Sequence, residues 1–226
     1  MRKALWLLAI LTILGGNLLL PQQHERQFGL QQSVPRSRAD VLLDVLGEAR
    51  TVLARMLWFK MDLLHEQLDR QGIPHEKQSE LLPLLRMITL LDHRLEDAYD
   101  IIVADLVRGH GRHQEAREIL EEGLRYNPRS VTLLQRKAMM LFKDEHYEEV
   151  IPVVQAGLAA TVDRVDILNM CRLGFRSELK LGHPDRAEYY LRLMFSVMPG
   201  DPAAASLWKE LRGVPPPPDV LYPGVR

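Results

Sequence analysis

Apolar residues follow a helical period along the middle of the chain. They recur at every third or fourth position from Val41 to Leu63, which places them on one face of an α-helix. Ser37 is suited to cap this helix and Gly72 to end it, so the pattern predicts a helix over 39–72. The helix is longer than a hairpin needs, which leaves part of it to pack as a cap or to serve in self-association. The apolar stripe consists of Val41, Val45, Ala49, Val52, Met56, Phe59 and Leu63.

A shorter apolar stretch follows the long helix. It predicts a second helix over about 79–91, in which Pro83 is tolerated because the first N–H groups of a helix have no acceptor within it. The two helices form a divergent first hairpin, and we assign them together to the segment 39–96.

The apolar pattern at the N-terminus has no polar face. Residues 4–20 carry no charge, and Arg2 and Lys3 precede them, which is the layout of a signal anchor or a secretory signal. We predict a single-pass transmembrane signal anchor over 1–21, with the N-terminus in the cytoplasm because the nearest cations lie on that side. The body of the protein then lies on the extracytoplasmic, periplasmic-type side. Residues 22–38, which are polar and contain two prolines, predict a linker.

Two other interpretations of the N-terminal segment stay open. Cleavage as a signal peptide needs small residues one and three positions before the cut, whereas the candidate Gly16 has Leu14 in the second of these places. A buried core helix would show a polar face, which the segment lacks. The sequence therefore favours a retained anchor.

From about residue 97 the pattern repeats at a longer interval. Gly123-Leu124 recurs as Gly157-Leu158, 34 residues further on, and a longer series with fixed internal offsets occurs twice. Small residues let the two helices of a hairpin approach closely, while bulky neighbours fill the remaining groove. The residues of this structural repeat signature are Gly111, Ala116, Leu120, Gly123 and Pro128, then Gly157, and then Gly182, Ala187, Leu191 and Pro199.

The signature resembles that of the tetratricopeptide repeat (TPR) family, over about half of the chain. The resemblance implies an all-α fold in which antiparallel helical hairpins build a right-handed superhelix, a TPR-like solenoid, preceded by the N-terminal membrane helix. Membrane-anchored TPR proteins of the bacterial envelope type are similar in outline. The resulting domains are repeats over 97–130, 131–164 and 165–200 within 97–200, a capping helix over 201–213, and a Pro-rich tail over 214–226 that is predicted to be extended.

The second repeat departs from the pattern of the family. Glu145 stands where the family has its turn glycine, Val150 where it has alanine, and Val162 where it has the closing proline. These departures weaken the match without changing the alternation of small and large residues.

The same resemblance implies a concave surface lined by the first helix of each hairpin. Its side chains combine Met and Phe with cations and amides, a mixture suited to an extended peptide whose carboxylates and backbone the polar groups hold. We therefore predict a non-enzymatic scaffold that binds a segment of a partner protein and supports complex assembly. The predicted partner-binding residues are Asp105, Arg108, Gln135, Met139, Phe142, Lys143, Asn169, Arg172 and Arg176.

Composition and charge narrow the class of partner. The 226 residues are 46% hydrophobic and 26% charged, which is typical of a globular protein. Lys and Arg number 29 against 30 Asp and Glu, so the basic excess of a nucleic-acid-binding protein is absent. Cys171, the single cysteine, lies in an apolar helical stretch and is predicted to be a small core residue.

Motifs that carry chemistry are missing from the sequence. It has no phosphate-binding loop, no nucleophile-elbow serine, no paired CxxC and no HExxH, so we predict neither an enzyme nor a cofactor. A metal site would need the histidines of different turns, which roughly 8–10 Å of helix packing keeps too far apart for ligand bonds of about 2 Å. Those histidines are His110, His113, His146 and His183.

Three alternatives to the peptide-binding scaffold stay open at this point. A homo-oligomeric scaffold would pair the 39–72 helix with its copy, and a metal-binding protein would use the turn histidines. An RNA-binding helical repeat of pentatricopeptide type is opposed by the near-neutral charge and by the apolar N-terminus.

Overall fold

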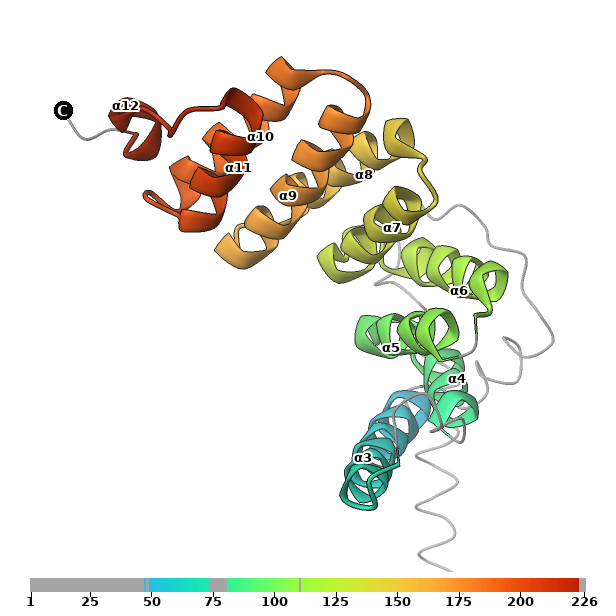
Figure 1. Ribbon diagram of the computed structural model, residues 1–226. Helices are drawn as coiled ribbons and strands as arrows, with labels where there is room; N and C mark the ends of the chain where they lie inside the picture. Colours follow the sequence, from blue (N-terminus) through green and yellow to red (C-terminus); the bar gives the residue numbers. More distant parts are fainter. Residues whose placement is uncertain (1–46, 48, 74–80, 110, 224–226) are drawn as a thin grey trace, which may run out of the picture. The chain divides into compact units, whose positions relative to one another are not determined.

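The described part of the chain consists of helices joined by short turns (Figure 1). The computed structural model describes residues 47, 49–73, 81–109 and 111–223, which all belong to the unit Leu46–Arg226. No strand occurs in these residues, which confirms the predicted all-α class. The helices are α3 (Ala49–Arg70), α4 (Leu81–Leu91), α5 (Glu96–Arg108), α6 (His113–Tyr126), α7 (Val131–Lys143), α8 (Tyr147–Ala160), α9 (Arg164–Lys180), α10 (Pro184–Val197), α11 (Pro202–Arg212) and α12 (Pro218–Leu221).

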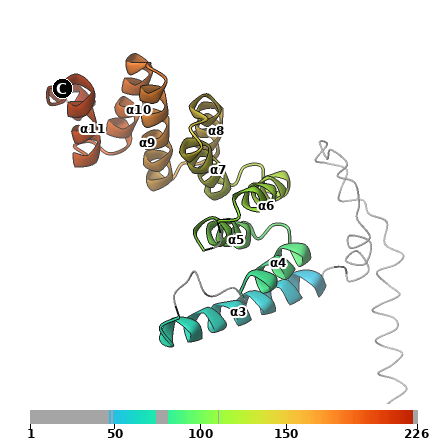
Figure 2. The same cartoon turned by 45° about the vertical axis from the view of Figure 1, so that its right-hand side comes forward.

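Consecutive helices pack in pairs. Contacts join α3 to α4, α5 to α6, α7 to α8 and α9 to α10, and each pair lies side by side in both views (Figures 1 and 2). The first helices of neighbouring pairs also touch, α5 with α7 and α7 with α9. A row of first helices is therefore available as a binding surface.

Glycines allow the closest contacts between these helices. A Cβ on Gly123 of α6 would lie 2.9 Å from Tyr99 Cγ and 3.1 Å from Leu133 Cδ1. A Cβ on Gly174 of α9 would lie 2.6 Å from the ring of Tyr190. Real Cβ atoms essentially never come within 3.0 Å of another heavy atom, so the rings of Tyr99 and Tyr190 occupy space that only glycine leaves open.

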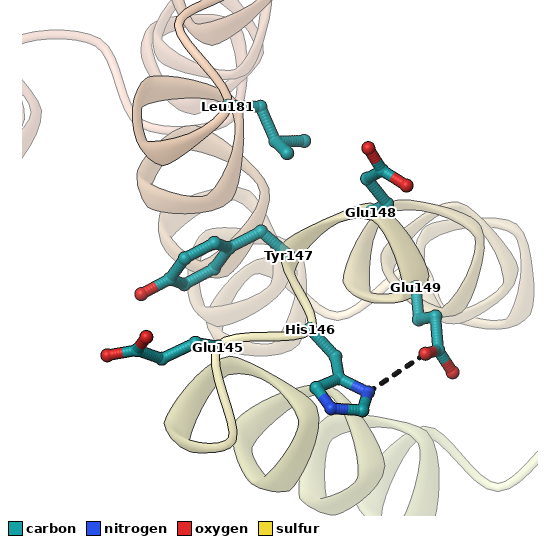
Figure 3. Close-up of a pocket in the computed structure, with 6 residues that line it drawn as sticks. All are labelled: Glu145, His146, Tyr147, Glu148, Glu149 and Leu181. Atoms are coloured by element: carbon teal, nitrogen blue, oxygen red, sulfur yellow. Dashed lines mark hydrogen bonds and ion pairs between the residues drawn. The ribbon is translucent and has the colours of Figure 1, made fainter.

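The turns inside the hairpins use a left-handed residue. Gly111 has φ +62° and Gly182 has φ +77°, and Glu145 adopts the same conformation with φ +63° (Figure 3). After Glu145, the N–H of His146 donates to the carbonyl of Leu141 at 2.9 Å, which closes the end of α7. The turn is thus kept in the α7–α8 hairpin although its residue has a Cβ that disfavours it.

A polar network joins three helices of the N-terminal half. Arg86 of α4 donates to both carboxylate oxygens of Glu122 of α6, at 2.8 and 2.7 Å, and the hydroxyl of Tyr99 of α5 donates to the same carboxylate at 3.2 Å. Burial raises the pKa of Tyr99. Burial alone would also raise the pKa of Glu122, but its hydrogen bonds outweigh burial, and the pKa lies below the usual 4.5.

The C-terminal segment differs from the extended tail that we predicted over 214–226. Helix α12 lies within it, Val220 is buried, and the carbonyl of Leu221 accepts a hydrogen bond of 3.0 Å from the N–H of Gly200. The prolines set the entry to this helix, and the apolar pair that follows packs back against the core beside α10.

The predicted membrane anchor over 1–21, the linker over 22–38 and the Ser37 cap lie outside the described residues. Within those that are described, no helix is both long enough and apolar enough to cross a bilayer.

The strained turn generates the first prediction. Replacing Glu145 by Gly removes about 1 to 2 kcal/mol of left-handed strain from the folded state. Part of this gain is offset because Gly raises the conformational entropy of the unfolded chain. We expect E145G to raise the free energy of unfolding by about 0.5 to 1 kcal/mol, measured by urea unfolding followed by circular dichroism. The matched control is E148G, which introduces Gly into the first turn of α8 and should lower stability by a similar amount. A loss of stability in E145G would contradict this account.

The Arg86–Glu122 pair generates the second prediction. We expect Glu122→Gln to lower the free energy of unfolding by about 1 to 3 kcal/mol at pH 7, because a charged hydrogen bond is lost. The folded pKa of Glu122 is depressed, so its contribution is complete above the unfolded value near 4.5 and disappears as the pH falls through the folded value. Urea unfolding at a series of pH values should therefore show the two proteins converging in acid.

A control for this experiment lies on the same helix. Glu118 is exposed and accepts a hydrogen bond only from Gln114 among the described residues, so E118Q should change stability by less than about 0.5 kcal/mol. A deficit of E122Q that stays constant with pH would show that packing rather than charge is responsible.

Candidate partner-binding groove

A groove with a volume of about 170 Å³ lies between α5 and α7. The two helices are in contact, and both contribute apolar residues to the lining of the groove. The lining residues are Val103, Ala104, Val107, Arg108, His113, Arg136, Met139, Met140, Lys143 and Asp144. We call this feature the α5–α7 groove.

An ion pair joins the two helices that form the α5–α7 groove. Arg136 of α7 donates from Nε and Nη2 to the two carboxylate oxygens of Asp100 of α5, at 2.6 and 2.7 Å. This paired geometry fixes both distance and orientation, and the bonds to Asp100 raise the pKa of Arg136. Arg136 therefore holds α7 to α5, and Asp100 already neutralises its charge.

Two further ion pairs link α6 to α7 nearby. Lys137 Nζ lies 2.6 Å from Glu121 Oε1, and Arg117 Nη2 lies 2.7 Å from Asp144 Oδ2 at the end of α7. Asp144 is the one acidic residue of the lining, and its charge is thus also matched.

Two cationic side chains of the lining have no acidic ion-pair partner among the described residues. Arg108 ends α5 and Lys143 ends α7, and both side chains are exposed. Neither has an ion-pair partner among the residues that the structure describes. The rim of the groove consequently carries positive charge above an apolar floor.

The structure brings together three of the nine predicted partner-binding residues. Arg108, Met139 and Lys143 line the α5–α7 groove, and the other six lie outside its lining. Asp105 is only 6% exposed, so its predicted contact with a partner is contradicted by burial within the protein.

The remaining predicted residues have other surroundings. Phe142 packs against the core and meets Tyr147 edge to face, with ring centroids 5.2 Å apart. Asn169 accepts a hydrogen bond of 3.1 Å from Arg172 on the same helix. Gln135 of α7 and Arg176 of α9 are not part of the groove lining.

Sequence reasoning missed several members of the lining, above all Arg136 and Asp144. A signal for the first existed, since Asp100 and Arg136 are 36 residues apart, close to one repeat, on successive first helices. An acid and a cation at this separation are candidates for a bridge between neighbouring repeats. Val107 and Met140 carried no such signal, because any apolar residue of a helix could face the core instead.

A second hollow, of about 220 Å³, lies beside the turn between α7 and α8 (Figure 3). Glu145, Glu148 and Glu149 surround it and are exposed, and no Lys or Arg is part of its lining. His146 is hydrogen-bonded to Glu149 at 2.9 Å. Tyr147 and Leu181 complete its lining, so the hollow combines an acidic turn with a small apolar surface.

Histidines and one cysteine are the candidates for metal binding or nucleophilic chemistry in the described residues. His183 pairs with Glu178 at 2.9 Å in a different turn from His146, and no group of three or more potential ligands in this part of the chain is placed to hold a metal. His110 lies outside the described residues. Burial raises the pKa of the Cys171 thiol to about 12, so the reactive thiolate is scarce at neutral pH.

Comparison with known proteins identifies the fold. A solved structure from a functional characterization of Pseudomonas aeruginosa PilF is similar, with 15% identity, a TM-score of 0.57, and coverage of 70% of this chain and 68% of that one. A double mutant of MamA RS-1 is similar with 16% identity, a TM-score of 0.53, and coverage of 73% and 84%. Both are TPR-type helical repeat proteins, so the fold is TPR-like. No family model and no curated protein matches the sequence.

Proposed function

We propose that this protein is a non-enzymatic, membrane-tethered scaffold that binds a segment of a partner protein in the α5–α7 groove and supports complex assembly. The observation that carries the proposal is the pairing of an apolar floor with two unmatched cations, Arg108 and Lys143. TPR-type neighbours are generally non-enzymatic scaffolds, which agrees with this class of function.

The chemistry of the groove defines the segment that fits it. A volume of about 170 Å³ suits one or two apolar side chains, and burying one of Leu size contributes about 1.5 to 3 kcal/mol. The rim cations then favour carboxylates on either side of that side chain. The expected ligand is a short stretch with a Leu, Met or Phe flanked by Asp or Glu.

The tether is the second part of the proposal. The uncharged run 4–20 behind Arg2 and Lys3 supports a retained anchor with the repeats on the extracytoplasmic side. A scaffold fixed at a membrane gains effective concentration for partners that share this surface.

The groove proposal predicts a reversal of ligand preference. Full-length protein in detergent should select acidic residues around an apolar side chain from a random-peptide phage library. The doubly reversed variant R108E/K143E should instead enrich Lys and Arg, because only the sign of the rim charge has changed. For a peptide selected on the unmodified protein, we expect its Kd to rise about five- to thirtyfold, measured by fluorescence anisotropy.

A matched control tests whether charge reversal in the last turn of any helix would change peptide binding. Arg108 and Lys143 lie in the last turns of their helices, as Lys209 does in α11, outside the groove. The K209E variant should retain the original peptide preference. If R108E/K143E selects the same acidic peptides as the unmodified protein, the groove is not the binding site.

The tether predicts the mass of the protein found in membranes. We expect protein purified from the membrane fraction to have the uncleaved mass of 26.0 kDa by intact mass spectrometry. Leu11→Arg places a charge at the centre of the run, at a cost of about 2.5 to 3.5 kcal/mol, and should shift protein to the soluble fraction. Leu30→Arg, in the linker, should leave it in the membrane. A mass that lacks the N-terminal segment would instead establish a cleaved signal peptide.

A further inference from the structure

Helix α3 has two apolar faces, and only one of them is buried. Ala54 and Met61 are buried where α3 packs on α4. On the rest of the helix, four large apolar side chains of the predicted stripe are exposed, although a stripe of this kind normally faces a core. Their exposed fractions are 61% for Val52, 64% for Met56, 64% for Phe59 and 49% for Leu63.

The exposed residues follow the spacing of a coiled-coil seam. They are separated by steps of four, three and four residues, the heptad pattern in which Met56 and Leu63 occupy a positions and Val52 and Phe59 occupy d positions. In this frame Ala54 and Met61 are both f positions, directly opposite the seam. The packing on α4 therefore turns the seam outward, and we call the four exposed residues the α3 seam.

We propose that the α3 seam binds the α3 seam of a second copy of this chain, with the two helices antiparallel. A self-complementary stripe suits a twofold contact, in which the same patch serves both partners. Antiparallel pairing places Val52 opposite Leu63 of the second copy and Met56 opposite its Phe59.

Charges beside the seam favour the antiparallel arrangement. Arg55 and Asp62 both occupy g positions, and in antiparallel coiled coils g positions face each other, which brings Arg55 to Asp62 of the second copy twice over. Parallel pairing would instead bring Arg55 to Lys60 of the second copy, with repulsion at both sites.

Both members of the expected pair are available. Asp62 is exposed and has no ion-pair partner within the described residues. Arg55 is also exposed, and its contact with Asp92 is loose, at 4.0 Å. The proposal does not depend on the α5–α7 groove, because no residue of the seam lines it.

Disulfide cross-linking tests both the contact and its direction. Full-length V52C and L63C proteins, carrying tags of different size, are oxidised separately and as a mixture in detergent. We expect a disulfide-linked heterodimer only in the mixture. In the antiparallel arrangement identical positions lie about 16 Å apart along the seam, beyond the Cα separation of about 7 Å that a disulfide spans. The unmodified protein controls for Cys171, which is buried.

Charge reversal provides a second, independent readout by light scattering over a range of concentrations. Arg55→Asp and Asp62→Arg should each raise the dimer dissociation constant about tenfold, and the double variant R55D/D62R should restore it. Cross-linking of V52C to itself would overturn the antiparallel arrangement. A monomer at all concentrations would overturn the proposal altogether. This includes a monomer in which another segment of the same chain covers the α3 seam.

Discussion

Close approach between paired helices is the constraint on which the described structure depends. Gly123 and Gly174 leave room for aromatic rings that a single extra carbon would displace, and Ala116 and Ala187 are fully buried at the corresponding contacts. Hairpins packed this tightly present their first helices side by side, and the Asp100–Arg136 pair then fixes the spacing of α5 and α7. The α5–α7 groove is thus a consequence of how the hairpins pack.

What the groove can select depends on which of its charges are already matched. Arg136 and Asp144 look like binding residues by type, yet each is held by a partner within the protein and serves the spacing of helices. Arg108 and Lys143 end their helices, are exposed, and have no ion-pair partner among the described residues. Tertiary contacts, and not residue type, decide whether a charge is already paired: Arg136 has a partner within the protein, and Arg108 has none among the described residues.

The sequence predicted those features that a local steric rule determines. The resemblance to TPR repeats implied the all-α class and the use of Gly111 and Gly182 as turn residues, and both glycines lie in turns with positive φ. Asp105 was misplaced because a rotation of less than a third of a turn separates an inward from an outward position on a helix. For α3, both faces are apolar, so the pattern could not decide which would pack. Helix α12 could not be predicted either, since it depends on a contact with Gly200, distant in sequence.

The joint between the second and third hairpins is crossed by ion pairs. Asp100–Arg136, Glu121–Lys137 and Arg117–Asp144 all span it, beside apolar contacts such as that of Gly123 with Leu133. Dissolved salt screens charges that are partly exposed but leaves apolar packing intact or strengthens it. The ionic composition of the surrounding medium therefore acts on these three ion pairs, while the apolar contact of Gly123 with Leu133 across the same joint is kept.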